Sequence, residues 1–227
     1  MSRRASAEGL GTSLLLYVIV GSGIAAETLG RDQAGQLIAH ALTVGLALGV
    51  LILLFQTVSG SHFNPAVTLG FWRTGTLTGR EAVGYAIAQV VGALAGVAAA
   101  NISFQQAPLE VSTTARTGVG LVFAEAIGTF VLVFVILALV RLGKEPAIPA
   151  AVGAWVAAIV FATSSTGFAN PAVTLSRVFT DTYAGIDPAS VPAFLVAQVL
   201  AGFLAAYATR FFFPDPANLN TTDLRGS

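Results

Sequence analysis

The sequence contains Asn-Pro-Ala-Val-Thr-Leu twice, within HFNPAVTLGF at 62–71 and within FANPAVTLSRVF at 168–179. The two asparagines, Asn64 and Asn170, are 106 positions apart. Asparagine is a favoured N-cap and proline a favoured first helical residue, so each copy predicts the start of a helix. The apolar segments that follow span 65–73 and 171–179. Nine residues at about 1.5 Å each make about 13 Å of helix, less than half the thickness of a bilayer core.

The composition indicates that lipid is the solvent for most of the protein surface. Of the 227 residues, 55% are hydrophobic and 10% are charged, and the mean hydropathy is +0.80. A soluble domain carries about 25% charged residues. The net charge of zero gives no electrostatic reason to expect a nucleic-acid partner. With no cysteine and two histidines, the chain is expected to hold neither a metal nor another cofactor.

Six further segments are long and apolar enough to cross a bilayer, which requires about 20 residues. They lie at 8–26, 36–58, 81–101, 118–140, 147–166 and 188–213. The first could be read as a signal peptide, because two arginines precede an apolar run. However, its beginning, AEGLGT at 7–12, recurs in mid-chain as AEAIGT at 124–129, where no signal peptide can lie. Both are better explained as the beginning of a membrane-spanning helix.

The repeat extends over the whole chain. YAIAQVVGALAG at 85–96 resembles FLVAQVLAGFLA at 194–205, which aligns Gln89 with Gln198. We therefore expect two halves, 1–105 and 118–227, joined by a loop at 106–117, with a polar tail closing the second half. Three full spans per half is an odd number, so the second half is inverted. The predicted fold is an all-α membrane protein with six transmembrane helices and two re-entrant half-helices that meet inside the bundle, since lipid-exposed loops are excluded at membrane depth.

This geometry suits passive passage of small uncharged solutes. Two helix N-termini facing each other make a positive spot in mid-membrane, and the asparagine amides add N–H donors. A cation is repelled there and loses its hydration, whereas a neutral molecule with lone pairs is accepted. Lysine and arginine number eight against three in favour of the side that holds both termini, which predicts cytoplasmic termini and a multi-pass protein of the inner (plasma) membrane.

SGSHFNPAVTLGF, TGFANPAV and the two AE..GT segments resemble the aquaporin/aquaglyceroporin (major intrinsic protein) family over nearly the full chain. The resemblance implies one pore per subunit, built around Asn64, Pro65, Ala66, Asn170, Pro171 and Ala172. It also implies a homotetramer in the lipid bilayer. Glu8 and Glu125 are expected to brace the re-entrant loops, and His62 to brace a loop or to line the inner mouth. A carboxylate inside a span needs such partners on physical grounds as well.

The sequence departs from the family pattern at the outer filter. Family members with orthodox filters have arginine after the second Asn-Pro-Ala, whereas this chain has Val173, and Arg177 is not at the motif position. Alignment to the two Asn-Pro-Ala motifs of the family assigns Val44, Ile159 (or Ala158), Phe168 and Val173 to the filter. The alignment of the loop around Phe168 can shift by one residue. The prediction is a wide, arginine-free filter that passes polyols, urea and neutral metalloid acids such as arsenous acid, together with water.

Three alternatives compete with this channel. The first is a water-selective aquaporin whose filter is rebuilt by other residues. The second is an ion-coupled transporter, which is disfavoured because no charged side chain lies deep within a predicted span. The third is a structural membrane protein whose pore is blocked by Phe168. No nucleophile–base pair or carboxylate dyad suggests an enzyme.

Overall fold

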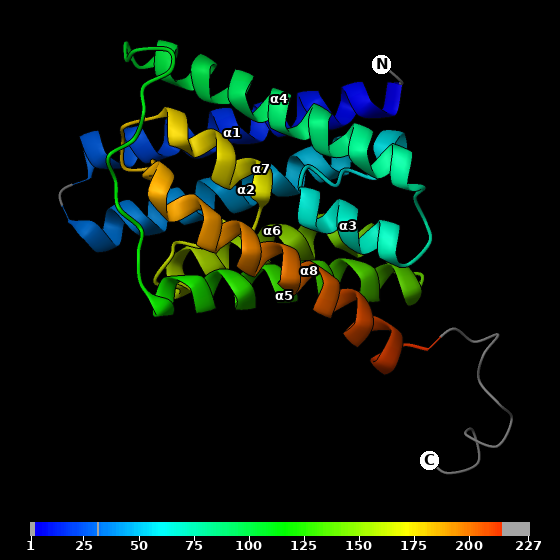
Figure 1. The fold of residues 1–227 in the computed structure, drawn as a ribbon. Coiled ribbons are helices and arrows are strands. Elements are labelled where there is room, and N and C mark those ends of the chain that lie inside the picture. Colours follow the sequence, from blue (N-terminus) through cyan, green and yellow to red (C-terminus); the bar gives the residue numbers. More distant parts are fainter. Residues whose placement is uncertain (1–2, 31, 215–227) are drawn as a thin grey trace, which may run out of the picture.

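The structure is a computed structural model that describes residues 3–30 and 32–214, so the predicted polar tail lies outside the described residues. All its regular elements are helices (Figure 1). The α-helices are α1 (Arg3–Leu29), α2 (Gln33–Ser59), α3 (Pro65–Arg73), α4 (Gly79–Ser103), α5 (Val119–Arg141), α6 (Ile148–Ala162), α7 (Pro171–Ser176) and α8 (Val191–Phe212). Three single 3₁₀ turns extend this set, namely η1 (Glu145–Ala147), η2 (Arg177–Phe179) and η3 (Pro188–Ser190).

Six helices in the described part of the chain are long and apolar enough to cross a membrane, which confirms the six predicted spans. The 3₁₀ turns η1 and η3 lead directly into α6 and α8, so each of these spans begins a few residues before its α-helix. Both turns begin at or next to a proline, Pro146 or Pro188. Proline suits the first turn of a helix because its missing N–H has no partner there in any case.

The two short helices are also where the sequence places them. α3 begins at Pro65 with Asn64 as its N-cap, and α7 begins at Pro171 with Asn170 as its N-cap. The beginning of α1 and the end of α8 lie at the same end of the bundle, which we call the termini face (Figure 1). α3 runs from the centre of the bundle towards the termini face, and α7 followed by η2 runs from the centre towards the other end, which we call the opposite face.

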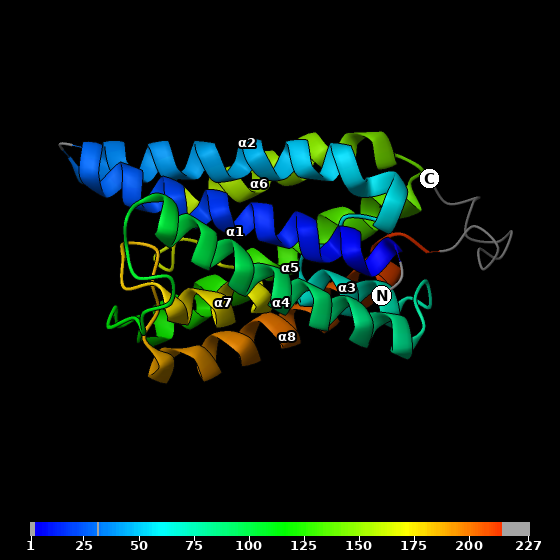
Figure 2. The ribbon, with the colours of Figure 1, turned by 90° about the horizontal axis from the view of Figure 1, so that it is seen from above.

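Glycines bring the long helices together in the first half and across the two halves. α2 and α6 lie side by side (Figure 2), and a Cβ added at Gly45 would be 2.5 Å from the backbone oxygen of Gly153. α1 and α4 approach as closely, because a Cβ at Gly96 would be 2.1 Å from the oxygen of Ser13. Small residues at such contacts are typical of membrane helices, where close backbone packing replaces the hydrophobic effect.

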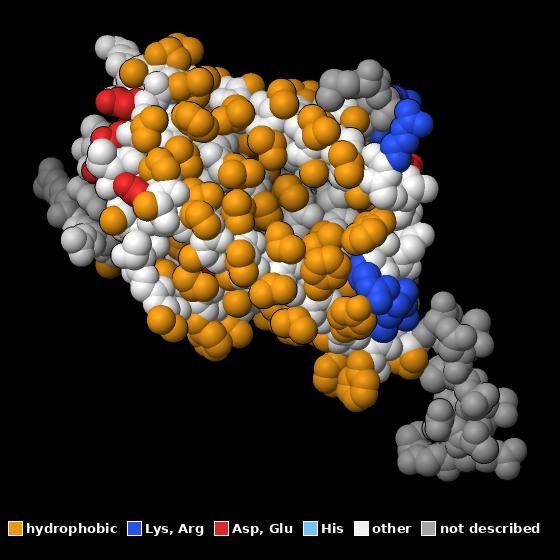
Figure 3. Space-filling view, in the orientation of Figure 1, with side chains coloured by type: hydrophobic (Ala, Val, Ile, Leu, Met, Phe, Trp, Pro, Cys, Tyr) orange, Lys and Arg blue, Asp and Glu red, His pale blue; other side chains and the backbone are white. Residues whose placement is uncertain are grey.

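The outer surface is apolar between the two ends of the bundle, as Figure 3 shows for one face. Large apolar side chains on the outside include Leu46, Leu53, Val83, Phe123 and Leu204, each more than half exposed. In this view, lysine and arginine side chains gather at the termini face of the bundle. Acidic side chains gather at the opposite face. An apolar belt with charged ends is the surface that a bilayer requires, and the chain is a multi-pass membrane protein.

Candidate solute pathway where the two half-helices meet

Asn64 and Asn170 cross-link the two half-helices at the centre of the bundle. The side-chain oxygen of Asn64 accepts from the N–H of Ala66 at 2.8 Å, and that of Asn170 accepts from Ala172 at 2.9 Å. Each amide nitrogen donates across to the other loop, Asn64 to the oxygen of Ala169 and Asn170 to the oxygen of Phe63, both at 2.8 Å. An amide NH₂ has two hydrogens, so each asparagine keeps one donor beyond its cross-link.

The two loops have the same backbone conformation. Phe63 and Ala169, each directly before an asparagine, have φ values of 48° and 49°. Two residues earlier in each loop, Ser61 and Gly167 have φ values of 51° and 56°. Non-glycine residues adopt this left-handed region rarely and at a cost of roughly 1–3 kcal/mol each. The loops therefore hold this shape only because surrounding contacts enforce it.

Two buried carboxylates supply those contacts. Glu8 accepts hydrogen bonds from the backbone N–H groups of His62 and Phe63, at 3.0 and 2.7 Å, and also from the side chains of Ser59 and Gln89. The side chains of Glu8 and of its counterpart in the second half, Glu125, have no exposed surface.

The equivalent carboxylate in the second half is Glu125. It accepts from the backbone N–H groups of Phe168 and Ala169, at 2.9 and 2.8 Å, and from the side chain of Gln198 at 2.6 Å. The sequence did not reveal a function for the repeated glutamines, Gln89 and Gln198. Each of them hydrogen-bonds to one of these carboxylates and to a threonine of a half-helix. Gln89 reaches the hydroxyl of Thr68, and Gln198 reaches that of Thr174.

A narrow cavity runs past the two asparagines. Its volume is about 50 Å³, and a single water needs about 10–15 Å³ on this measure, so it accommodates only a few small molecules at a time. Most of its wall is apolar. The long helices contribute Leu15, Ile19, His40, Val44, Leu48, Ile52, Leu132, Ile136, Val152, Val156 and Val160; the loops and half-helices contribute Ser61, His62, Phe63, Asn64, Val67, Thr166, Gly167, Phe168, Ala169, Asn170, Val173 and Arg177.

In each half, a side chain from the half-helix stacks on a side chain from the loop before it. The stacking residue lies seven positions after the asparagine, and its partner lies two positions before the asparagine. In the first half, the ring of Phe71 stacks on His62, with centroids 4.4 Å apart and planes 15° apart. In the second half, the Arg177 guanidinium carbon lies 3.5 Å from the centroid of the Phe168 ring. His62 and Phe168 line the cavity on either side of the asparagines, so these two stacks form layers of the pathway towards the two faces.

Comparisons with known proteins place the chain in a family. The model of the family described as major intrinsic protein matches residues 1–169. The chain belongs to the major intrinsic protein family. The family consists of membrane channels rather than enzymes.

Relatives of known name cover nearly all of the chain. The aquaglyceroporin AqpS of Rhizobium meliloti is 44% identical over 96% of this chain and 92% of its own length. Aquaporin AqpM of Methanothermobacter thermautotrophicus is 30% identical over 93% of this chain and 97% of its own. Among solved structures, the aquaglyceroporin from Plasmodium falciparum superimposes with a TM-score of 0.73 over 98% of both chains, at 23% identity, which shows a shared fold.

The four residues that the family pattern assigns to the filter do not all reach the cavity. Val44, Phe168 and Val173 line it, but Ile159 does not. A Cβ on Gly167 would be 2.8 Å from Ile159, and one on Gly128 would be 3.3 Å from it, so this side chain packs against the loop and α5. Val156 and Val160 line the cavity from α6 instead, and the alternative Ala158 does not. The register of α6 is set by its contact with α2 at Gly45 and Gly153, which the alignment to the Asn-Pro-Ala motifs could not reveal.

The pathway of this family member is also not free of arginine. Val173 occupies the motif position, yet Arg177 lines the same cavity one helical turn farther along and is 3% exposed. Its Nε donates to the oxygen of Ala184, in the loop that follows η2. The arginine-free filter remains a prediction for the motif position, while η2 continues the half-helix and carries Arg177 back over Phe168.

A second arginine supports the opposite-face loops from outside the spans. Arg116 donates from Nε to the oxygen of Gly185 at 2.8 Å and from Nη2 to the oxygen of Tyr183 at 3.0 Å. Its guanidinium carbon lies 5.0 Å from the Phe168 ring centroid. Burial lowers the pKa of Arg116 below its usual range, although an arginine stays charged at neutral pH.

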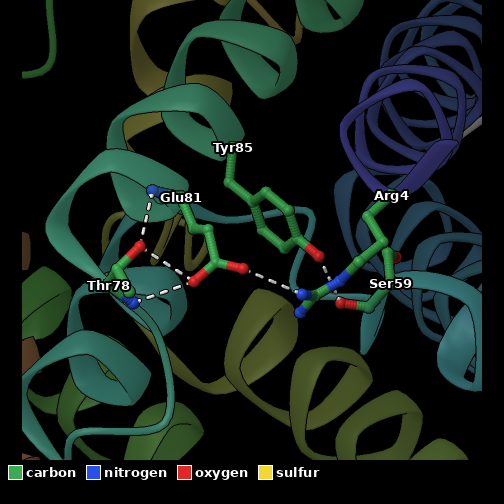
Figure 4. A network of polar contacts seen from close by, with 5 residues as sticks. All are labelled: Arg4, Ser59, Thr78, Glu81 and Tyr85. Atoms are coloured by element: carbon green, nitrogen blue, oxygen red, sulfur yellow. Dashed lines mark hydrogen bonds and ion pairs between the residues drawn. The ribbon is translucent and has the colours of Figure 1, made fainter. Parts of the chain in front are cut away.

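At the termini face the cavity gives way to a vestibule of about 480 Å³, and His62 and Ser61 line both. Arg4 is one of the residues on the vestibule wall. Figure 4 shows how it is held: it donates to Glu81 at 3.1 Å, while Tyr85 donates to the backbone oxygen of Ser59 at 2.8 Å. Glu81 also completes a capping box with Thr78 at the beginning of α4. Among the described residues, no group of three or more His, Cys, Asp or Glu side chains lies together as a metal site would need.

Proposed function

We propose that this protein is a passive channel for small uncharged solutes, namely glycerol-like polyols, urea and neutral metalloid acids such as arsenous acid, together with water. The observation that carries the proposal is the narrow cavity between the two asparagine-capped half-helices, which is mostly apolar but offers spare amide donors at its centre. The name of the relative that is 44% identical, an aquaglyceroporin, supports the polyol part of the proposal.

The chemistry of the wall favours neutral cargo. A solute that crosses must leave most of its water behind, and the apolar side chains do not replace the lost hydrogen bonds. The amides of Asn64 and Asn170 provide donors at the midpoint, which suits the lone pairs of a hydroxyl or carbonyl oxygen. A cation meets these donors and the buried charge of Arg177, so desolvation is not compensated.

One observation favours a second candidate, a water-selective channel with a rebuilt filter. The cavity is narrow, at about 50 Å³, and Arg177 and His40 both line it. Charged and polar groups on a tight wall favour the smallest hydrogen-bonding solute. The two candidates differ in one measurable quantity, the permeability to glycerol relative to that for water.

The test measures the uptake of a panel of solutes into a single preparation of proteoliposomes, with light scattering as the readout of vesicle volume. The proposal expects glycerol, urea and arsenous acid to enter faster than into protein-free vesicles, with a low activation energy. Rapid water movement with all three solutes excluded would contradict the proposal and support the water-selective candidate. Because the chain has no cysteine, mercurials should not block either flux.

We further propose a homotetramer with one pathway per subunit, in the inner membrane, with the termini face in the cytoplasm. The arginines that gather at this face in Figure 3 support the orientation through the positive-inside rule. Native mass measurement in detergent tests the assembly. A reporter fused after the last residue, active only in the cytoplasm, tests the orientation, and its inactivity would reverse the assignment.

A further inference from the structure

Two polar side chains on the cavity wall lie one helical turn beyond the two valines of the motif-based filter. On α2, His40 comes four residues before Val44; along the second half-helix, Arg177 comes four residues after Val173. α2 runs from the opposite face inwards, and α7 with η2 runs from the centre outwards. Four residues correspond to about 6 Å along a helix axis. Both displacements therefore lead towards the opposite face, and all four side chains line one cavity.

Arg177 has a hydrogen-bond donor to spare. The side chain is 3% exposed, its Nε is engaged by Ala184, and its guanidinium plane is supported by the Phe168 ring. The Nη2 atom is buried and has no hydrogen-bond partner within residues 3–30 and 32–214. A buried charged donor left without a partner is costly, which indicates a group that takes its partner from the pathway.

His40 supplies the complementary acceptor. The side chain is 2% exposed, and its Nδ1 lies 2.8 Å from the hydroxyl of Ser22. That hydroxyl is 3.2 Å from the backbone oxygen of Ile19, to which it donates. Because this hydroxyl can donate to Ile19, it can accept from Nδ1–H, and in that tautomer of the neutral imidazole the lone pair is on Nε2. No described residue bonds to Nε2, so this atom is open to a solute in the cavity.

We propose that His40 and Arg177 form the solute-selecting layer of the pathway, with Phe168 as its apolar side, in place of the valine layer. A neutral hydroxyl compound binds in this layer by accepting from Arg177 Nη2 and donating to His40 Nε2, while its carbon side packs on Phe168. The fixed charge of Arg177 turns cations away from the same position. This inference deepens the proposed channel function and rests on it.

The probe for the test is glycerol, and the readout is the ratio of glycerol to water permeability in proteoliposomes. We expect His40→Val and Arg177→Gln each to lower this ratio about three- to tenfold, the effect of losing one hydrogen bond. The double variant should lie within about twofold of the lower single variant, because both groups act on one bound molecule. His40→Gln and Arg177→Lys, which keep an acceptor and a donor, should restore part of the ratio. Tyr207→Phe, which removes an exposed hydrogen bond from Arg73 on the outer surface, is the control and should leave the ratio unchanged.

The outcomes separate this inference from the channel function itself. Glycerol exclusion by the unmodified protein would overturn the function before any variant is measured. Glycerol conduction with an unchanged ratio in both single variants would overturn only the His40–Arg177 layer, and a change in Val44→Thr or Val173→Thr would then place selection at the valines. A raised ratio in the single variants would also overturn the inference, since the pair would then act as a barrier. If Arg177→Gln cannot be recovered folded, the comparison of His40→Val with His40→Gln decides.

Discussion

The loop nearer the termini face carries His62 stacked on Phe71, whereas the loop nearer the opposite face carries Phe168 stacked under Arg177. The backbones of the two loops match within a few degrees of φ on either side of the stacking residue. The positions are therefore equivalent, but the polar member of each pair is exchanged: it comes before the asparagine in the first half and after it in the second. The two halves therefore share the backbone of the loop and half-helix. The two stacked residues in each half make the two ends of the pathway chemically different.

The difference also extends to how each loop is held. Glu8 accepts four hydrogen bonds and Glu125 accepts three. Ser59 and the equivalent Ser165 each accept from the backbone N–H two residues later, and Ser59 also donates to Glu8. The first loop thus depends on its carboxylate more than the second. Each prediction below tests or refines this comparison, in order of decreasing effect.

The largest effect should follow from removal of the carboxylates. Each buried donor that loses its acceptor costs about 1–3 kcal/mol, so Glu8→Ala strands four donors and Glu125→Ala three. We expect both variants to lose most of the folded protein recovered in detergent, and Glu8→Ala to lose more. Size-exclusion chromatography and thermal unfolding measure this, with the exposed Glu110→Ala as control. If Glu125→Ala were the less stable variant, the four-against-three ordering would be wrong.

The next effect tests helix packing in the two halves. Alignment of Gln89 with Gln198 pairs Gly96 on α4 with Ala205 on α8. A Cβ at Gly96 would lie 2.1 Å from the oxygen of Ser13, so Gly96→Ala should cost about 1–3 kcal/mol of stability by forcing α1 and α4 apart. The reciprocal change, Ala205→Gly, should cost about 0.5–1 kcal/mol through helix propensity. Thermal unfolding of the two variants gives the comparison, and equal midpoints would contradict it.

A smaller effect is expected at the asparagines. Asn64→Ala and Asn170→Ala each remove a helix cap and one cross-link between the loops, and loss of a cap costs about 0.5–2 kcal/mol. The oxygen of Asn170 accepts from both Ala172 and Val173, whereas that of Asn64 accepts from Ala66. Asn170→Ala should therefore have the lower unfolding midpoint. A lower midpoint for Asn64→Ala would show that the extra bond to Val173, at 3.4 Å, contributes nothing.

The smallest effect should come from the ion pair at the vestibule. Arg4 and Glu81 are 47% and 41% exposed, and water screens such pairs strongly. Arg4→Ala should therefore leave the unfolding midpoint and the glycerol permeability within measurement error of the unmodified protein. A loss of permeability would instead show that Arg4 attracts or orders solute at the termini face.

Much of this architecture follows from local signals in the sequence. Each Asn-Pro pair specifies a helix beginning, and the half-helix at 65–73 has the predicted bounds because cap, proline and apolar run lie next to one another. The second half-helix divides into α7 and η2, so its predicted 171–179 is correct in extent but changes character at Arg177. The six spans were found within a few residues because a span is defined by the length of its apolar segment.

The site was less predictable because it depends on which way each helix faces. Of the residues that the family pattern assigns to the filter, Val44 and Val173 line the cavity, whereas on α6 the neighbour of Ile159, Val160, lines it. A change of one residue turns a side chain by about 100° around a helix, enough to move it from the cavity into the packing. His40 gave one usable signal, since it is one helical turn from Val44 on the same face of α2.

The sequence alone determined that the chain is a duplicated, six-span helical membrane protein with two half-helices capped by asparagine. Hydropathy, capping and repetition are properties of neighbouring residues, so they need no knowledge of the fold. Only the tertiary structure decided that Arg177 returns over Phe168, that its Nη2 has no hydrogen-bond partner in the described part of the chain, and that α6 presents Val156 and Val160 to the cavity. These outcomes depend on contacts between α2 and α6 and between the loop and η2, where close packing fixes orientations that no local pattern encodes.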